Sequence, residues 1–168
     1  MINANADNRN KLRVLFLCTH NSARSQMAEG LLRVMYGDRF EAYSAGVAPT
    51  SVDPFALKVM REIGIDISQQ HSKNVSEFHD LAFDLAVTVC DQAKQACPIV
   101  STDLRHPGRS PKARQILHHR FADPAAVTES EEKRLLAFRR TRDEIREWLS
   151  ETLSKAIDGD FKDPGRSD

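Results

Sequence analysis

The sequence predicts an α/β fold in which a parallel sheet is covered by helices on both faces. Two observations support this: short apolar runs alternate with longer amphipathic stretches, and the first run, at residues 12–17, is almost continuously apolar. The alternation is typical of strands joined by crossover helices, and the continuous run is typical of a strand buried on both faces. At 168 residues, the chain (1–168) is expected to form a single domain with an ordered core over about residues 12–153.

The first half of the chain continues this alternation. A helix is expected over residues 22–36, where apolar side chains recur at helical spacing until Gly37. A second short strand is expected at residues 40–44. Asp53 and Pro54 form an N-cap and first-turn pair that begins another helix, which is predicted to end before the next glycine.

The second half of the chain adds two strands and one long helix. Strands are expected at residues 84–89 and, less regularly patterned, at residues 115–118. Thr128 and Glu131 resemble a capping box, and the helix behind them is predicted to run to about residue 153.

Composition and charge exclude several classes of partner. The 24 basic and 24 acidic side chains give no net charge, so neither nucleic acid nor an anionic membrane is expected as a partner. The apolar runs are too short for a membrane-spanning helix. Residues 1–11 are polar and lack the apolar centre of a signal peptide, so a cytoplasmic location is expected. Residues 158–168 are expected to form a loose polar tail.

A loop between the first strand and the first helix carries the motif Cys-x5-Arg-Ser, from Cys18 to Ser25. Consecutive backbone N–H groups in such a loop can face inward and bind an anion, towards which the helix also points its positive N-terminus. Arg24 adds a planar guanidinium that suits tetrahedral oxyanions. Thiolates are favoured in such surroundings, so Cys18 is the candidate nucleophile. The candidate oxyanion-binding residues are Thr19, His20, Asn21, Ser22, Ala23, Arg24 and Ser25.

Cys90 and Cys97 are the remaining cysteines, and an odd total argues against a secreted disulfide framework. If the stretch between them were helical, their Cα atoms would lie about 10 Å apart. A disulfide needs about 4.4–6.8 Å, so a bond between them would require this segment to change conformation. Spacing alone leaves open that both are structural thiols.

Asp123 is the candidate proton donor. Pro124 restricts it to extended conformations, which can direct its carboxyl group into a site. Cys18, Cys90 and the segment before Asp123 all follow predicted strands, and the carboxyl ends of parallel strands are where sites lie in such folds. A simple turn aspartate is the alternative. The histidines fit no zinc-binding spacing, and neither a metal nor another cofactor is expected.

The stretch from Leu17 to Gly30 resembles the phosphate loop and first helix of the low-molecular-weight protein tyrosine phosphatase superfamily. Within it, the likeness is strongest to the thioredoxin-coupled arsenate reductases of that fold. The resemblance covers about residues 12–153 and continues through Tyr43-Ser44-Ala45-Gly46, Gly64-Ile65-Asp66-Ile67-Ser68, Val87-Thr88-Val89-Cys90-Asp91, Cys97-Pro98 and Asp123-Pro124-Ala125. It implies a single-domain three-layer sandwich with a four-stranded parallel sheet.

The resemblance also implies a mechanism for reducing arsenate to arsenite. Cys18 would attack arsenate held by the loop and Arg24, while Asp123 protonates the departing oxygen. Cys90 would then attack the Cys18 sulfur and release arsenite, and Cys97 would take over the disulfide from Cys90. Thioredoxin would reduce that disulfide, and phosphate or sulfate would compete with arsenate. The resemblance therefore implies five catalytic residues: Cys18, Arg24, Cys90, Cys97 and Asp123.

Three positions depart from patterns common among these relatives. Ala125 stands where phosphatases usually carry an aromatic residue, which favours a small inorganic oxyanion over a phosphotyrosine peptide. Lys73 stands where some relatives bind potassium with a carboxylate, so a fixed cation is expected in place of the ion. The remaining matches to that potassium site are Asn21, Glu29 and Ser44. His20 replaces a common glycine, and either a role in favouring the thiolate or simple solvent exposure is compatible with it.

Two other functions remain compatible with the sequence. One is a phosphatase acting on phosphotyrosine or a small phosphomonoester, which needs Cys18, Arg24 and Asp123 but neither of the other cysteines. The other is an oxyanion or redox sensor that uses the loop for binding alone. The reductase is the only one of the three that uses Cys90 and Cys97.

Overall fold

The computed structural model of the chain describes residues 11–91 and 111–157. Cys97 lies outside the described residues, as do the polar segments at the two ends of the sequence and the histidine at position 106.

The centre of the fold is a four-stranded parallel sheet. Its strands are β1 (Leu12–Cys18), β2 (Phe40–Gly46), β3 (Ala82–Thr88) and β4 (Lys112–His118). They lie in the order β2-β1-β3-β4, so β1 and β3 form the middle of the sheet. The predicted α/β fold is confirmed, and both edge strands are longer than their apolar patterns indicated. Their additional residues pair at the sheet edge without needing an unbroken apolar run.

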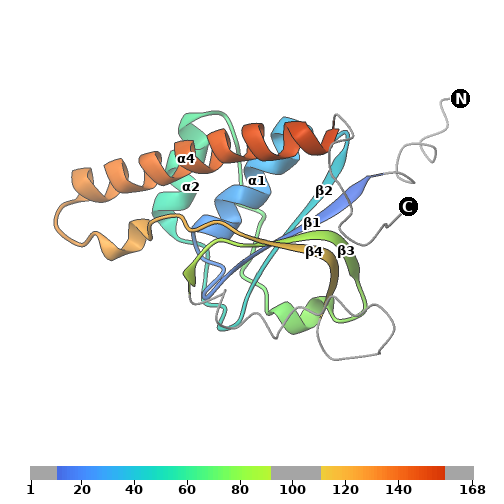
Figure 1. The fold of residues 1–168 in the computed structure, drawn as a ribbon. Helices are drawn as coiled ribbons and strands as arrows, with labels where there is room; N and C mark the ends of the chain where they lie inside the picture. Colours follow the sequence, from blue (N-terminus) through green and yellow to red (C-terminus); the bar gives the residue numbers. More distant parts are fainter. Residues whose placement is uncertain (1–10, 92–110, 158–168) are drawn as a thin grey trace, which may run out of the picture.

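Three α-helices accompany the sheet: α1 (Arg24–Tyr36), α2 (Pro54–Glu62) and α4 (Glu131–Ile157). They pack together on one side of the sheet in Figure 1, whereas the short helix η1 (Val75–Phe78) lies on the other side. Helix α4 buries several apolar side chains in the core, whereas Trp148 is only partly covered; the buried ones are Leu135, Phe138, Ile145, Leu149 and Leu153.

Two helix starts differ from the sequence-based expectation. Helix α1 begins at Arg24 instead of residue 22, because Asn21 has a left-handed backbone (φ 48°) and the loop must curve before a helix can start. Helix α4 is capped by Ser130, whose Oγ accepts the Lys133 N–H at 3.2 Å, so the capping box at Thr128 is wrong. Asp53 is the N-cap of α2 as predicted, and its carboxylate accepts the Phe55 N–H.

The carboxyl ends of β1 and β3 are tied together beyond the last ladder residues. The Val89 N–H donates to the Leu17 carbonyl at 2.9 Å, and the Phe121 N–H donates to the Val89 carbonyl at 3.1 Å. The segments that carry Cys18, Cys90 and Asp123 therefore follow one edge of the sheet, as the sequence predicted.

Candidate active site

The loop after β1 is curved by Asn21 and braced from outside. The carbonyl groups of Thr19 and His20 accept hydrogen bonds from the N–H groups of Ala48 and Thr50, and the Ser22 carbonyl accepts one from Asp53. These carbonyls therefore point away from the centre of the loop. The left-handed residue between them gives the alternation of backbone conformation that forms anion-binding nests.

The last residue of β2, Gly46, approaches this loop closely. A Cβ atom at that position would lie 2.6 Å from the Thr19 carbonyl oxygen and 2.9 Å from the Asn21 nitrogen. Any larger residue would push the loop away from β2, because both neighbouring atoms belong to the backbone. Glycine at this position is thus a requirement of the loop geometry.

The thiol of Cys18 lies at the base of the loop and is buried, with 3% of the residue exposed. The Asn21 N–H donates to Cys18 Sγ at 3.2 Å, and Ser25 Oγ lies 2.9 Å from the same sulfur. Ser25 Oγ already accepts from Asn21 Nδ2 at 2.8 Å. The Ser25 hydroxyl proton is therefore directed at the sulfur, so the site holds two donors for a Cys18 thiolate.

Arg24 and Asp123 meet at the mouth of the loop. Arg24 Nη1 donates to the Phe121 carbonyl at 3.2 Å, and Nη2 lies 3.6 Å from Asp123 Oδ2. Asp123 caps the short helix η3 (Pro124–Ala126) by accepting the Ala125 N–H at Oδ1. Its extended backbone, predicted from Pro124, leaves Oδ2 directed at the guanidinium.

The segment that contains Phe121, whose carbonyl accepts from Arg24, is stabilised by contacts between aromatic rings. The His119 ring lies 4.7 Å from that of Phe121 and 5.2 Å from that of Trp148, measured between ring centroids. This burial lowers the pKa of His119, and the neighbouring His118 lowers it further. The neutral ring packs without a buried charge, and it supports the residue whose carbonyl orients Arg24.

Cys90 reaches the same site from the end of β3. It is buried to the same extent as Cys18, and its Sγ lies 3.6 Å from the hydroxyl of Thr19, the residue after the candidate nucleophile. The structure thus brings Cys18, Arg24, Cys90 and Asp123 together on one edge of the sheet. Cys97, the fifth predicted catalytic residue, lies outside the described residues.

His20 is exposed, and its carbonyl accepts a hydrogen bond from the Thr50 N–H. The remaining oxyanion-loop residues divide by burial: Asn21, Ala23 and Ser25 are buried, whereas Thr19, Ser22 and Arg24 are partly exposed. The loop therefore has a buried base around Cys18 and an open rim through which a small anion can enter.

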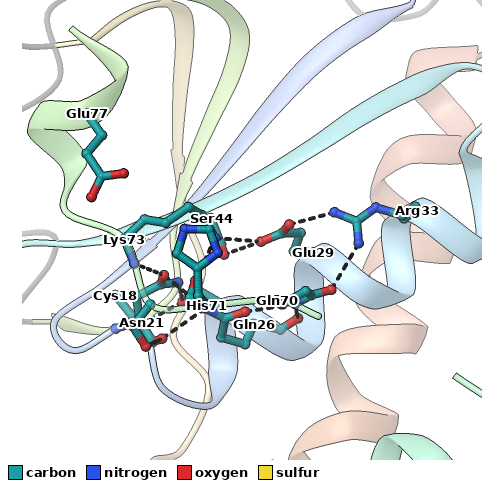
Figure 2. A network of polar contacts seen from close by, with 12 residues as sticks. Cys18, Asn21, Gln26, Glu29, Arg33, Ser44, Gln70, His71, Lys73 and Glu77 are labelled. Carbon is teal, nitrogen blue, oxygen red and sulfur yellow. Dashed lines mark hydrogen bonds and ion pairs between the residues drawn. The ribbon is translucent and has the colours of Figure 1, made fainter. Parts of the chain in front are cut away.

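A polar network, buried at Asn21 and Gln26 and more exposed at Arg33, supports the loop from the side of α1 (Figure 2). Asn21 Oδ1 accepts from Gln26 Nε2 and from the Lys73 N–H, each at 2.9 Å. Gln26 Oε1 in turn accepts from Gln70 Nε2 at 2.7 Å, and Gln70 Oε1 accepts from Arg33 at 3.1 Å. The left-handed conformation of Asn21 is thereby fixed by side chains from separate segments.

Glu29 forms the charged end of this network. Its carboxylate accepts from Arg33 Nη2 at 2.6 Å and from the Ser44 hydroxyl, and Lys73 Nζ lies 3.5 Å from Oε2 (Figure 2). Only 7% of the Glu29 side chain and 12% of the Lys73 side chain are exposed. The lysine ammonium therefore lies beside the carboxylate where a fixed cation was predicted. Its other contact is the His71 carbonyl, at 2.8 Å.

Replacing Lys73 with alanine is expected to lower the free energy of unfolding by about 1–3 kcal/mol, because a buried carboxylate loses one of its two cations. Chemical denaturation with urea checks this. Lys58→Ala is the matched control, since Lys58 pairs with Glu131 at 3.3 Å on the exposed surface and should cost less than about 0.5 kcal/mol. Equal effects of the two substitutions would contradict the structural role of Lys73.

Sequence reasoning missed the residues that hold Asn21 in place, namely Gln26, Arg33, Gln70 and Ser72. Ser72 Oγ donates to the Asn21 carbonyl at 2.7 Å, and Gln26 is fully buried. The one available signal was a glutamine within the apolar helical pattern, because a polar side chain at a buried position needs a partner.

Within residues 11–91 and 111–157, no three His, Cys, Asp or Glu side chains form a group that could hold a metal ion. In the same described ranges, every helix is too short or too polar to cross a membrane.

Comparisons with known proteins agree with this geometry. Residues 13–162 match the family described as low molecular weight phosphotyrosine protein phosphatase. An arsenate reductase of Halalkalibacterium halodurans is 42% identical over 136 residues, which cover 81% of this chain and 91% of that protein. An arsenate reductase of Bacillus subtilis is 39% identical over 138 residues, covering 82% and 92%.

A solved structure titled as an arsenate reductase in the phosphate-binding state superposes with a TM-score of 0.64 at 26% identity, covering 86% of this chain and 98% of that one. The fold, the Cys-x5-Arg-Ser loop and the family match over most of the sequence lead to the same assignment. The chain belongs to the low molecular weight phosphotyrosine protein phosphatase family.

Proposed function

We propose that this protein reduces arsenate to arsenite, with Cys18 as nucleophile and Cys90 as the thiol that resolves the intermediate. The observation that carries the proposal is the second buried thiol beside the oxyanion loop, with Cys90 Sγ 3.6 Å from Thr19 Oγ1. Hydrolysis of a phosphate ester has no use for that thiol. The relatives named arsenate reductase, at about 40% identity over most of the chain, support the same reaction.

The first step uses the loop as an oxyanion site. Arsenate enters between the loop amides and Arg24, which turns from Asp123 to the anion. The Cys18 thiolate, held by Ser25 and the Asn21 N–H, attacks arsenic. Asp123 gives a proton to the departing oxygen, which leaves as water, and a covalent S–As bond remains. Phosphate and sulfate compete because they have the same tetrahedral shape and carry a similar charge.

The second step reduces arsenic. The Cys90 thiolate attacks Cys18 Sγ, so an S–S bond forms while the S–As bond breaks. The electron pair of the broken bond stays on arsenic, which passes from As(V) to As(III) and leaves as arsenite. The two sulfur atoms together lose the two electrons that arsenic gains.

The resulting disulfide lies deep in the protein, because Cys18 and Cys90 are each only 3% exposed. An external dithiol protein cannot reach such a buried bond directly. Cys97 is proposed to attack Cys90 and carry the disulfide to the reductant, for which thioredoxin is proposed. This cycle needs a reducing compartment, so the cytoplasm is the proposed location.

The proposal is tested by measuring arsenite formation with thioredoxin, thioredoxin reductase and NADPH. Continuous turnover is expected with this system, and much slower turnover with glutathione and glutaredoxin. If neither reducing system gave arsenite, the proposed function would be contradicted. Turnover with glutaredoxin alone would leave arsenate reduction standing and reject thioredoxin as the reductant.

A phosphatase activity follows from the same first step, since Cys18, Arg24 and Asp123 suffice to hydrolyse an aryl phosphate. Asp123→Asn is expected to lower kcat for phenyl phosphate by about 10²–10⁴-fold, because phenolate needs a proton to leave. The loss should be smaller with p-nitrophenyl phosphate, whose leaving group is stable without one.

The control for this prediction is Asp143→Asn, which alters an exposed aspartate that pairs with Arg142 at 2.7 Å. It should leave both rates unchanged. An Asp123→Asn protein whose losses are equal for the two leaving groups would exclude Asp123 as the proton donor.

A further inference from the structure

A second polar cluster lies immediately after Cys90, at the ends of β3 and β4. It consists of Thr88, Asp91, His118 and Arg120, here called the Asp91 cluster. Asp91 Oδ2 lies 3.1 Å from Arg120 Nε, and Oδ1 lies 3.4 Å from His118 Nε2. The other ring nitrogen of His118 lies 2.8 Å from Thr88 Oγ1.

The sheet register explains how these residues meet. Thr88 and His118 are direct partners in the pairing of β3 with β4, and the His119 N–H donates to the Thr88 carbonyl at 3.0 Å. Arg120 follows two residues later, beside the point where the chain leaves β3. The His118 ring and the Arg120 guanidinium therefore come from the end of β4 and the residues just beyond it, and both contact the residue directly after Cys90.

Cys90 is consequently held on both sides. On its N-terminal side, the backbone of Val89 is bonded to Leu17 and Phe121. On its C-terminal side, the carboxylate of Asp91 contacts His118 and Arg120. Between these two anchors, the Cys90 thiol is buried and directed at Thr19.

We propose that Asp91, held by His118 and Arg120, is a positioning residue that keeps the Cys90 thiol in place for its attack on Cys18. This inference rests on the proposed function, because only a reductase needs that attack. The ion-pair partners of Asp91 are His118 and Arg120, which belong neither to the oxyanion loop nor to α1. Its effect is therefore confined to the step that forms the disulfide and does not extend to the first covalent step.

The contacts of the Asp91 cluster are weak enough to let the Cys90 thiol move in a later step. Asp91 and Arg120 side chains are 53% and 69% exposed, so their attraction is screened by water. Such contacts favour one orientation of Cys90 by a small factor and still break when Cys90 must turn towards another thiol. A fully buried ion pair at this place would oppose that movement.

The test measures how readily the Cys18–Cys90 disulfide forms, without using arsenate. A Cys97→Ser protein is equilibrated with mixtures of reduced and oxidised glutathione, and the effective concentration of the two thiols is obtained from the disulfide fraction. Adding Asp91→Ala or Arg120→Ala is expected to lower that effective concentration about threefold. The two substitutions together should lower it no further than the larger single effect.

Arg114→Ala is the matched control. Arg114 lies within β4, its side chain is also 69% exposed, and it pairs with Asp84 at 3.7 Å towards the N-terminal end of that strand. It should leave the effective concentration unchanged. Arg120→Lys should restore most of the loss seen with alanine. Hydrolysis of p-nitrophenyl phosphate should remain within about 1.5-fold in every variant, because positioning of Cys90 plays no part in that reaction.

Unchanged disulfide formation in Asp91→Ala would overturn the inference, and so would a parallel loss of phosphatase activity, which indicates general disruption of the site. Strictly additive effects of Asp91→Ala and Arg120→Ala would also overturn it. The proposed function is judged separately, by arsenite formation in the unaltered chain. A protein that forms the disulfide but no arsenite would overturn the reductase assignment and remove the reason for positioning Cys90.

Discussion

Replacing Cys18 with serine is expected to abolish both arsenate reduction and aryl phosphate hydrolysis, lowering kcat by at least about 10⁴-fold for each. Both reactions begin with attack by the same sulfur. A serine hydroxyl at this position has no general base beside it, because its neighbours Ser25 and the Asn21 N–H are hydrogen-bond donors. These donors stabilise an anion that already exists and remove no proton.

The fold should survive this substitution, since serine is slightly smaller than cysteine and the Ser25 and Asn21 donors have an oxygen to contact. Thermal unfolding of Cys18→Ser checks this, together with binding of phosphate, which the loop amides and Arg24 should retain. A folded Cys18→Ser protein with more than about 1% of either activity would place the nucleophile elsewhere.

Replacing Cys90 with serine is expected to separate the two activities. Steady-state arsenite formation should fall by at least about 10³-fold, because no thiol remains beside Cys18 to break the S–As bond. Hydrolysis of p-nitrophenyl phosphate should stay within about threefold of the original rate, because water resolves the phospho-enzyme. The Thr19 hydroxyl can contact serine as it contacts the Cys90 thiol.

The ratio of the two rates in the same preparation is the decisive quantity, since it is independent of how much protein is folded. Ala23→Ser tests the loop itself as a control, because it changes a buried loop residue without touching Cys90 and should affect both activities alike. If Cys90→Ser lost both activities in equal proportion, Cys90 would be a structural thiol.

The approximate positions of the strands could be predicted from the sequence because each depends on local pattern. An unbroken apolar run indicates a buried strand such as β1, and Asp53 before Pro54 indicates a helix start by capping chemistry alone. The oxyanion loop could also be predicted from the sequence, because the nest, the helix N-terminus and the arginine are formed by consecutive residues. Each of these features depends on residues that lie close together in the sequence.

Features that depend on packing between distant segments were harder to predict from the sequence. Thr128 and Ser130 both have side chains suited to cap α4, and in the structure Ser130 accepts the Lys133 N–H. The Gln26–Gln70 contact and the Asp91 cluster join segments whose separation in sequence carries no signal of contact. Lys73 beside Glu29 was expected only through the resemblance to relatives, and the structure brings the two charges together.

The central claim is that two electrons pass from cysteine thiols of this chain to arsenic. A single-turnover experiment tests it most directly: fully reduced protein is mixed with arsenate without external thiol, arsenite is quantified and the disulfides are mapped by mass spectrometry. One arsenite per protein molecule and a Cys90–Cys97 disulfide are expected, with Cys18 returned to the thiol. Three intact thiols and no arsenite, in a protein that hydrolyses aryl phosphates briskly, would contradict it and identify a phosphatase.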